Sequence, residues 1–145
     1  MEYFTYELWR RIQGPRSQKA QMEWEARASR YLNKVSRLRP RLGDTTYRFF
    51  RDHGLHDGFV RGIGDGGTRK LTLKVDQFGK QFRLEFDEVT SVSFVYRSKG
   101  EKCEALLEWG YEEFSRQGEQ TRLEVLFSSG ATLAILFRKL TVKRV

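Results

Sequence analysis

Residues 71–86 read Leu-Thr-Leu-Lys-Val-Asp-Gln-Phe-Gly-Lys-Gln-Phe-Arg-Leu-Glu-Phe, and this stretch decides the fold. Apolar and polar residues alternate on both sides of Asp76–Gly79, a segment whose composition is typical of a tight turn. A period of two places alternate side chains on one face of a strand. The apolar set is Leu71, Leu73 and Val75 before the turn, and Phe82, Leu84 and Phe86 after it. The stretch therefore predicts a β-hairpin with one buried face.

The same alternation returns in three later runs, at Val92–Tyr96, Leu123–Phe127 and Leu133–Phe137. Ser128–Gly130 joins the last two runs as a tight hairpin. Short connections between neighbouring strands predict an antiparallel sheet. Residues 104–116 mix the helical and strand periods, and we expect a loop or short helical turns there.

The first 54 residues instead repeat their apolar side chains every three or four positions, which is typical of helices. Thr5 is the expected N-cap of a first helix. Ser17 is the expected N-cap of a second, longer helix that Pro40 ends or kinks. The apolar face of the second helix consists of Trp24, Ala28, Tyr31, Val35, Leu38 and Leu42. A third, short helix is expected between Asp44 and Gly54.

Strands with one apolar face need a cover, and helices with their own apolar stripes supply it. We therefore predict an α+β fold in which N-terminal helices pack on a C-terminal antiparallel sheet. A chain of 145 residues is expected to form a single domain. Its helical part covers residues 1–54 and its β part covers residues 55–145. The pattern leaves open whether the sheet stays open or curls into a barrel.

The composition limits the class of protein. The single cysteine, Cys103, has no disulfide partner within the chain, and the N-terminal residues lack the order of a secretory signal. No apolar run approaches the roughly 18 residues that span a bilayer, so we expect a cytoplasmic protein with no membrane role. The net charge is +8, and residues 1–62 hold 13 basic against 7 acidic residues. This surplus favours anionic partners without identifying one.

Both histidines lie in the stretch His53-Gly54-Leu55-His56-Asp57-Gly58, hereafter the junction. A metal site is one interpretation, but Gly54 ends the helix between the two rings and the sequence supplies few further ligands. Acid–base catalysis by His56 is a second, although an adjacent Asp57 would point to the opposite face of a strand. The third, which we favour, is structural. Here His56 hydrogen-bonds across the boundary between helices and sheet, and the glycines adopt conformations that other residues resist.

Two other segments invite a functional interpretation. Gly62–Gly67 resembles a phosphate-binding loop in composition, but it precedes a strand instead of opening a helix, so we expect a flexible hairpin loop. A stripe of basic side chains on the second helix is a candidate for contact with an anionic partner, with an ordinary solvated face as the alternative. This helix stripe consists of Arg27, Arg30, Lys34 and Arg37.

Three segments carry a family resemblance: the start Met1-x-Tyr-Phe-Thr-x-Glu-Leu-Trp9, the junction motif Gly54-Leu-His-Asp-Gly58, and the hairpin Leu126-Phe-Ser-Ser-Gly-Ala-Thr-Leu133. Together they resemble a family of small proteins from Bacillus-like bacteria that is classed as a domain of unknown function. The resemblance spans nearly the whole chain and implies no particular activity. The junction motif followed by antiparallel strands is also similar to β-rich immunity proteins of bacterial toxin systems. Members directed against nucleases are often acidic, and this basic chain departs from them.

These patterns predict a non-enzymatic protein-interaction module, because the sequence holds no recognised catalytic motif. The partner would be a protein, a toxin if the immunity resemblance holds. The alternative is a nucleic-acid-binding protein that uses the helix stripe. Neither hypothesis requires a cofactor or a metal.

Overall fold

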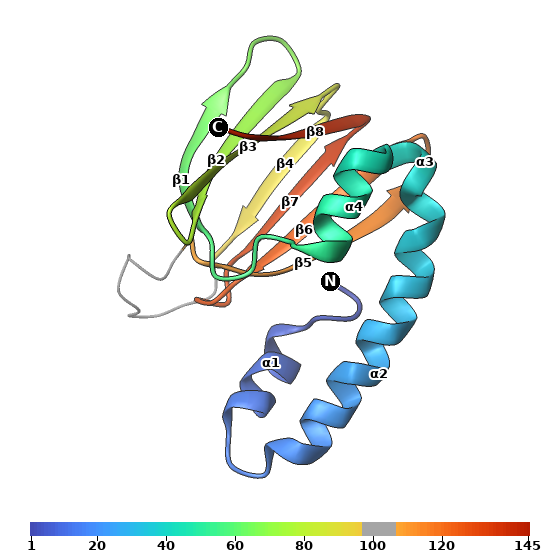
Figure 1. The fold of residues 1–145 in the computed structure, drawn as a ribbon, viewed down its shortest axis with the longest axis vertical. Helices are drawn as coiled ribbons and strands as arrows, with labels where there is room; N and C mark the ends of the chain where they lie inside the picture. The colour runs from blue at the N-terminus through green and yellow to red at the C-terminus, as the bar shows by residue number, and fades with distance from the viewer. Residues whose placement is uncertain (97–106) are drawn as a thin grey trace.

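The computed structural model describes residues 1–96 and 107–145, and within them the predicted α+β fold is confirmed (Figure 1). The helices are α1 (Tyr6–Gln13), α2 (Ser17–Val35), the 3₁₀ turn η1 (Ser36–Leu38), α3 (Arg39–Leu42) and α4 (Asp44–Asp52). The strands are β1 (Phe59–Asp65), β2 (Lys70–Gln77), β3 (Lys80–Asp87), β4 (Ser91–Val95), β5 (Trp109–Gln117), β6 (Gln120–Phe127), β7 (Thr132–Phe137) and β8 (Lys139–Arg144). All pairs of neighbouring strands are antiparallel, as expected.

The helix boundaries follow from local chemistry. The hydroxyl of Thr5 accepts a hydrogen bond from the Leu8 N–H, which satisfies one of the unpaired donors of the first turn of α1. Arg16 adopts a left-handed backbone between α1 and α2, so Ser17 is the first residue of α2 and the predicted cap is displaced by one position. The long helix ends at Val35, and the chain turns through η1 before Pro40 opens the next short helix, α3.

The eight strands form two four-stranded sheets, ordered β1-β2-β3-β8 and β4-β7-β6-β5. Two pairs of strands connect them: β3 continues into β4 after a short bend, and β7 continues into β8 through Arg138 alone. The hydrogen bonds run on across this bend, because Thr90 N–H donates to Leu136 and Arg138 N–H donates to Asp87. Strands that change sheet in this way form the corners of packed sheets.

The apolar faces of the two sheets meet in one core. Phe86 from the first sheet packs edge-on against Phe137 from the second, with ring centroids 5.1 Å apart. Helix α4 packs beside β8, where the Thr46 hydroxyl donates to the Leu140 carbonyl, and Phe50 contacts Phe114. By contrast, α1 and the first turns of α2 project away from both sheets (Figure 1). The helices thus cover one side of the sheets only partly.

Three strands were not predicted. Gly62–Asp65 belongs to β1 instead of a flexible loop, because its backbone pairs with β2 even though its side chains are mostly exposed. Residues 109–116 belong to β5 instead of a loop or helical turns. A β-bulge between Trp109 and Tyr111 shifts the register there and interrupts the alternation on which sequence reading depends. The short strand β8 follows β7 too closely to be separated from it by pattern alone.

The glycine within this bulge has a steric reason. A Cβ at Gly110 would lie 2.7 Å from the Leu126 carbonyl oxygen of the paired strand. The aromatic residues around it are mainly core, since Trp109 and Phe114 are buried.

No helix in the described ranges is long and apolar enough to cross a membrane. Cys103 lies outside the described residues.

Candidate binding surfaces

The junction is attached to β5 by its backbone. Asp57 N–H donates to the Trp109 carbonyl at 2.9 Å, and Trp109 N–H donates to the Gly58 carbonyl at 2.6 Å. Gly58 has no room for a side chain, because a Cβ there would lie 2.8 Å from the Leu55 carbonyl oxygen. Gly54 has φ +63, which closes α4 in the left-handed region. These contacts fix the path of the chain from the helices into the first sheet.

The two histidines of the junction do not face each other. The His53 ring lies beside Phe49, whereas the His56 ring packs on Tyr111 with centroids 4.9 Å apart. His56 Nδ1 donates to the Gly110 carbonyl at 2.6 Å, across the boundary between helices and sheet. Within the described ranges, His, Cys, Asp and Glu side chains form no group of three that could hold a metal ion.

The expectation that Asp57 would point away from His56 is wrong. His56 Nε2 lies 3.4 Å from Asp57 Oδ1. The reason is that Asp57 precedes β1 and has φ +61, a left-handed conformation to which strand alternation does not apply. The pair is half exposed. Because Nδ1–H donates to the Gly110 carbonyl, Nε2 pairs with Asp57 only when the ring is protonated, and the Nδ1 hydrogen bond is the link between the junction and β5.

A carboxyl group with an altered pKa lies behind the junction. Glu112 Oε2 accepts a hydrogen bond of 2.6 Å from Trp109 Nε1, and Glu112 borders a cavity of about 30 Å³ together with Tyr31 and Phe50. Loss of solvation in these surroundings raises the pKa of Glu112 to about 7, despite the Trp109 hydrogen bond and nearby His56, which lower it. Glu112 is therefore a proton-exchanging group near neutral pH, in a cavity with room for a water molecule and no larger ligand.

A second carboxylate of β5 holds the start of the chain. Glu113 is 5% exposed, and it accepts three backbone hydrogen bonds of 2.6–2.7 Å. The donors are the N–H groups of Glu2, Tyr3 and Phe4. The sequence does not predict this role, because Glu113 is more than 100 positions away from the three donors and no local pattern connects them. The ring of Phe4 then packs among Trp24, Tyr31 and Tyr111.

The attached segment occupies part of the helix stripe. Lys34 Nζ lies 2.9 Å from the Glu2 carboxylate, and this hydrogen bond lowers the pKa of Glu2. Arg27 pairs with Glu23 at 2.6 Å and also donates to the Tyr3 carbonyl. Two of the four stripe cations are thus already paired, whereas Arg30 and Arg37 are exposed and make no ion pair with the described residues. This leaves the stripe with half of its predicted free charge.

A different set of cations crosses the outer face of the first sheet. Lys74 on β2 is directly opposite Arg83 on β3, and Arg83 is directly opposite Lys143 on β8. On the other side of Lys74, Arg61 occupies a bulge in β1. We call Arg61, Lys74, Arg83 and Lys143 the cationic row. Like charges in directly opposite positions of a sheet destabilise it, so this arrangement has a cost in folding stability.

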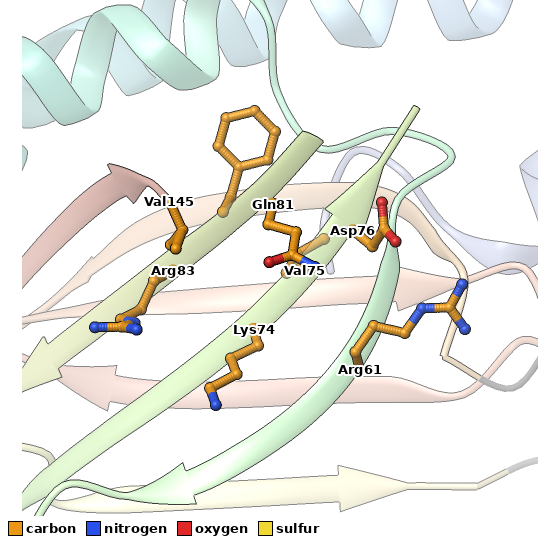
Figure 2. Close-up of a pocket in the computed structure, with 8 residues that line it drawn as sticks. Arg61, Lys74, Val75, Asp76, Gln81, Arg83 and Val145 are labelled. Carbon is orange, nitrogen blue, oxygen red and sulfur yellow. The ribbon is translucent and has the colours of Figure 1, made fainter. Parts of the chain in front are cut away.

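Three members of the cationic row, Arg61, Lys74 and Arg83, border a hollow of about 150 Å³ on this face (Figure 2). Arg61, Lys74 and Arg83 come to it from three neighbouring strands, with Asp76 and Gln81 beside them. The described carboxylates offset only part of the charge. Glu85 lies 2.7 Å from Lys143 and 3.9 Å from Arg83, but Arg61 and Lys74 have no such partner within residues 1–96 and 107–145. The hollow is therefore an electropositive site open to solvent.

Comparisons with known proteins add little to this geometry. No family model matches the chain, and no curated protein matches it significantly. Among solved structures, one similar chain is an uncharacterized protein from Neisseria gonorrhoeae, at 10% sequence identity and a TM-score of 0.49. The alignment covers 62% of this chain and 93% of that one. The resemblance to a Bacillus-like family stays a prediction.

Proposed function

We propose that the protein is a non-enzymatic interaction module that binds an anionic macromolecule through the cationic row. The observation that supports this most strongly is the register that sets Lys74, Arg83 and Lys143 opposite one another. Glu85 offsets part of the repulsion between Arg83 and Lys143, but Arg61 and Lys74 have no carboxylate partner among the described residues. A polyanion would convert the remaining repulsion into favourable contacts. We place this function in the cytoplasm.

The other candidate surfaces offer less for binding or catalysis. His56 Nδ1 is engaged with the Gly110 carbonyl, which supports a structural role for the junction. Lys34 and Arg27 of the helix stripe are engaged with the N-terminal segment. Binding of nucleic acid through the stripe stays a prediction, and it serves as the comparison in the test.

Heparin chromatography tests the proposal with two matched double variants. Lys74→Gln with Arg83→Gln removes two charges from the cationic row, and Arg30→Gln with Arg37→Gln removes two from the helix stripe. Because binding of a polyanion depends on local contacts and on salt, the first variant should elute at clearly lower salt than wild type. The second should elute close to wild type. Equal shifts would mean that only net charge matters, and a larger shift for the stripe variant would transfer the site to α2.

A further inference from the structure

Phe78 occupies the tip of the β2–β3 hairpin in a conformation that its side chain disfavours. Gln77 pairs with Lys80, so the turn consists of Phe78 and Gly79, with φ values of +50 and +72. Two-residue turns with both φ values positive favour Asn-Gly, and an aromatic residue at the first position is strained. The Phe78 side chain is 77% exposed. It makes no ring contact with the described aromatic residues, so the strain is not offset by packing.

The exposed ring lies near the cationic row along the same strand. Phe78 and Lys74 are four residues apart, which corresponds to about 13 Å at about 3.3 Å per residue. Between them, Asp76 and Gln81 form a directly opposed pair beside the hollow. The Arg61 guanidinium lies 5.0 Å from the Phe59 ring, which adds a second aromatic group to this end of the face. Cations, hydrogen-bonding groups and an exposed aromatic tip thus follow one another over a short distance.

We propose that the partner of this face is a single-stranded nucleic acid. The inference rests on the function proposed above and adds the class of ligand. Arg61, Lys74 and Arg83 would contact successive phosphates, and Phe78 would stack on an unpaired base. Proteins that bind single strands combine these two features, a basic track and aromatic rings on which bases stack.

The Phe78 ring distinguishes a single-stranded nucleic acid from other polyanions. An acidic protein or peptide would contact the cations, but it has no base on which the exposed Phe78 ring could stack. Duplex DNA keeps its bases paired and stacked, so an aromatic side chain on a turn finds no free base face there. Asp76 and Gln81 supply an acceptor and a donor for base edges exposed in a single strand.

The test is a fluorescence-anisotropy titration of the full chain with four probes at low and moderate salt. The probes are a single-stranded DNA and a single-stranded RNA of about 12 nucleotides, the corresponding DNA duplex, and a labelled poly-glutamate peptide. The variants are Phe78→Asn, the two-charge variant of the cationic row, and the two-charge variant of the helix stripe. Asn suits the first position of this turn, so Phe78→Asn removes the ring while its thermal stability should equal or exceed that of wild type.

We expect a single-stranded probe to bind more tightly than the duplex and the peptide. Phe78→Asn should weaken single-strand binding by about fivefold to a hundredfold and leave peptide binding unchanged, since base stacking contributes to the former alone. Loss of two phosphate contacts in the cationic-row variant should reduce the slope of log affinity against log salt by about 1.4.

Each contrary result has a defined meaning. If poly-glutamate binds as tightly as either single strand, and Phe78→Asn changes neither, the nucleic-acid inference is wrong while the proposed anionic-partner function stands. If the duplex binds best, the ligand class is likewise wrong. If no probe binds even at low salt, or if only the helix-stripe variant loses binding, the proposed function itself fails.

Discussion

Reversal of the charge at Lys74 should stabilise the protein, which would be an unusual effect for a change on a surface strand. Lys74 faces Arg83 directly, and opposite Cβ atoms in an antiparallel pair are about 5 Å apart. The charged groups lie at the ends of flexible side chains, and two unit charges in water interact by about 0.8 kcal/mol at about 5 Å and about 0.4 kcal/mol at about 10 Å. Lys74→Glu replaces a repulsion by an attraction, so we expect the free energy of unfolding to rise by about 0.5–1.5 kcal/mol at low salt.

The same strand provides a matched control. Lys70 lies on the same face of β2, opposite Asp87, and its Nζ is 3.3 Å from the Asp87 carboxylate. Lys70→Glu makes the identical substitution and the identical change in net charge, but it replaces an attraction by a repulsion. Its free energy of unfolding should therefore fall, by an amount within the usual range of about 0.2–1 kcal/mol for exposed ion pairs.

Urea denaturation of both variants and wild type at low salt and at about 1 M salt measures these effects. At the higher salt the Debye length is about 3 Å, so the difference between the two variants should largely disappear. If both variants shift in the same direction by similar amounts, or if their difference persists at high salt, the cationic row carries no electrostatic strain. The main support for the proposed binding face would then be lost.

Two further predictions concern the carboxylates of β5. Glu113→Gln should lower the free energy of unfolding by about 1–3 kcal/mol in denaturant titrations, because the new amide N–H₂ would face the Glu2 N–H and could not accept the hydrogen bond that Oε2 accepts in wild type. An unchanged midpoint would contradict the role of Glu113 in holding the first residues. For Glu112, the folded-state pKa of about 7 lies above its ordinary value of 4.5, so the folded protein holds a proton that the unfolded chain releases. Its contribution to stability is complete below about pH 4.5 and is lost as pH rises toward about 7, and Glu112→Gln should flatten this decline when unfolding is measured across that range.

The fold was largely predictable where the side chains alternate regularly. The β2–β3 hairpin and the β6–β7 hairpin have one buried face each, with Leu73, Leu84, Leu123 and Ile135 fully buried, and periodicity detects such strands. It failed at β5, where the bulge at Gly110 breaks the period, and at Gly62–Asp65 of β1, where backbone pairing occurs without a buried side chain. A single sequence gives no signal for pairing that does not depend on side-chain pattern.

The candidate binding face could be predicted only in part. The alternation on both sides of the predicted turn implies that Lys74 and Arg83 share the outer face. A turn over Asp76–Gly79 would, however, place Lys74 opposite Gln81, and the pairing with Arg83 follows from the two-residue turn of Phe78 and Gly79 in the structure. Lys143 could not be added, because β8 was not recognised as a strand. The helix stripe, in contrast, was visible as a pattern, but the pairing of Lys34 with Glu2 depends on how a distant carboxylate, Glu113, fixes the first residues.

The two connections between the sheets, β3 to β4 and β7 to β8, also bear on the order of folding. Hairpins such as β2–β3 and β5–β6 join residues that are close in sequence, and loops of this size close within microseconds. The β3–β8 ladder instead joins Asp87 to Lys139 and Phe82 to Arg144. Contacts so distant in sequence have a high entropic cost of loop closure, so they form late and slow the overall rate. The β3–β8 ladder should therefore form after the β2–β3 hairpin, and its formation should limit the rate at which the native state appears.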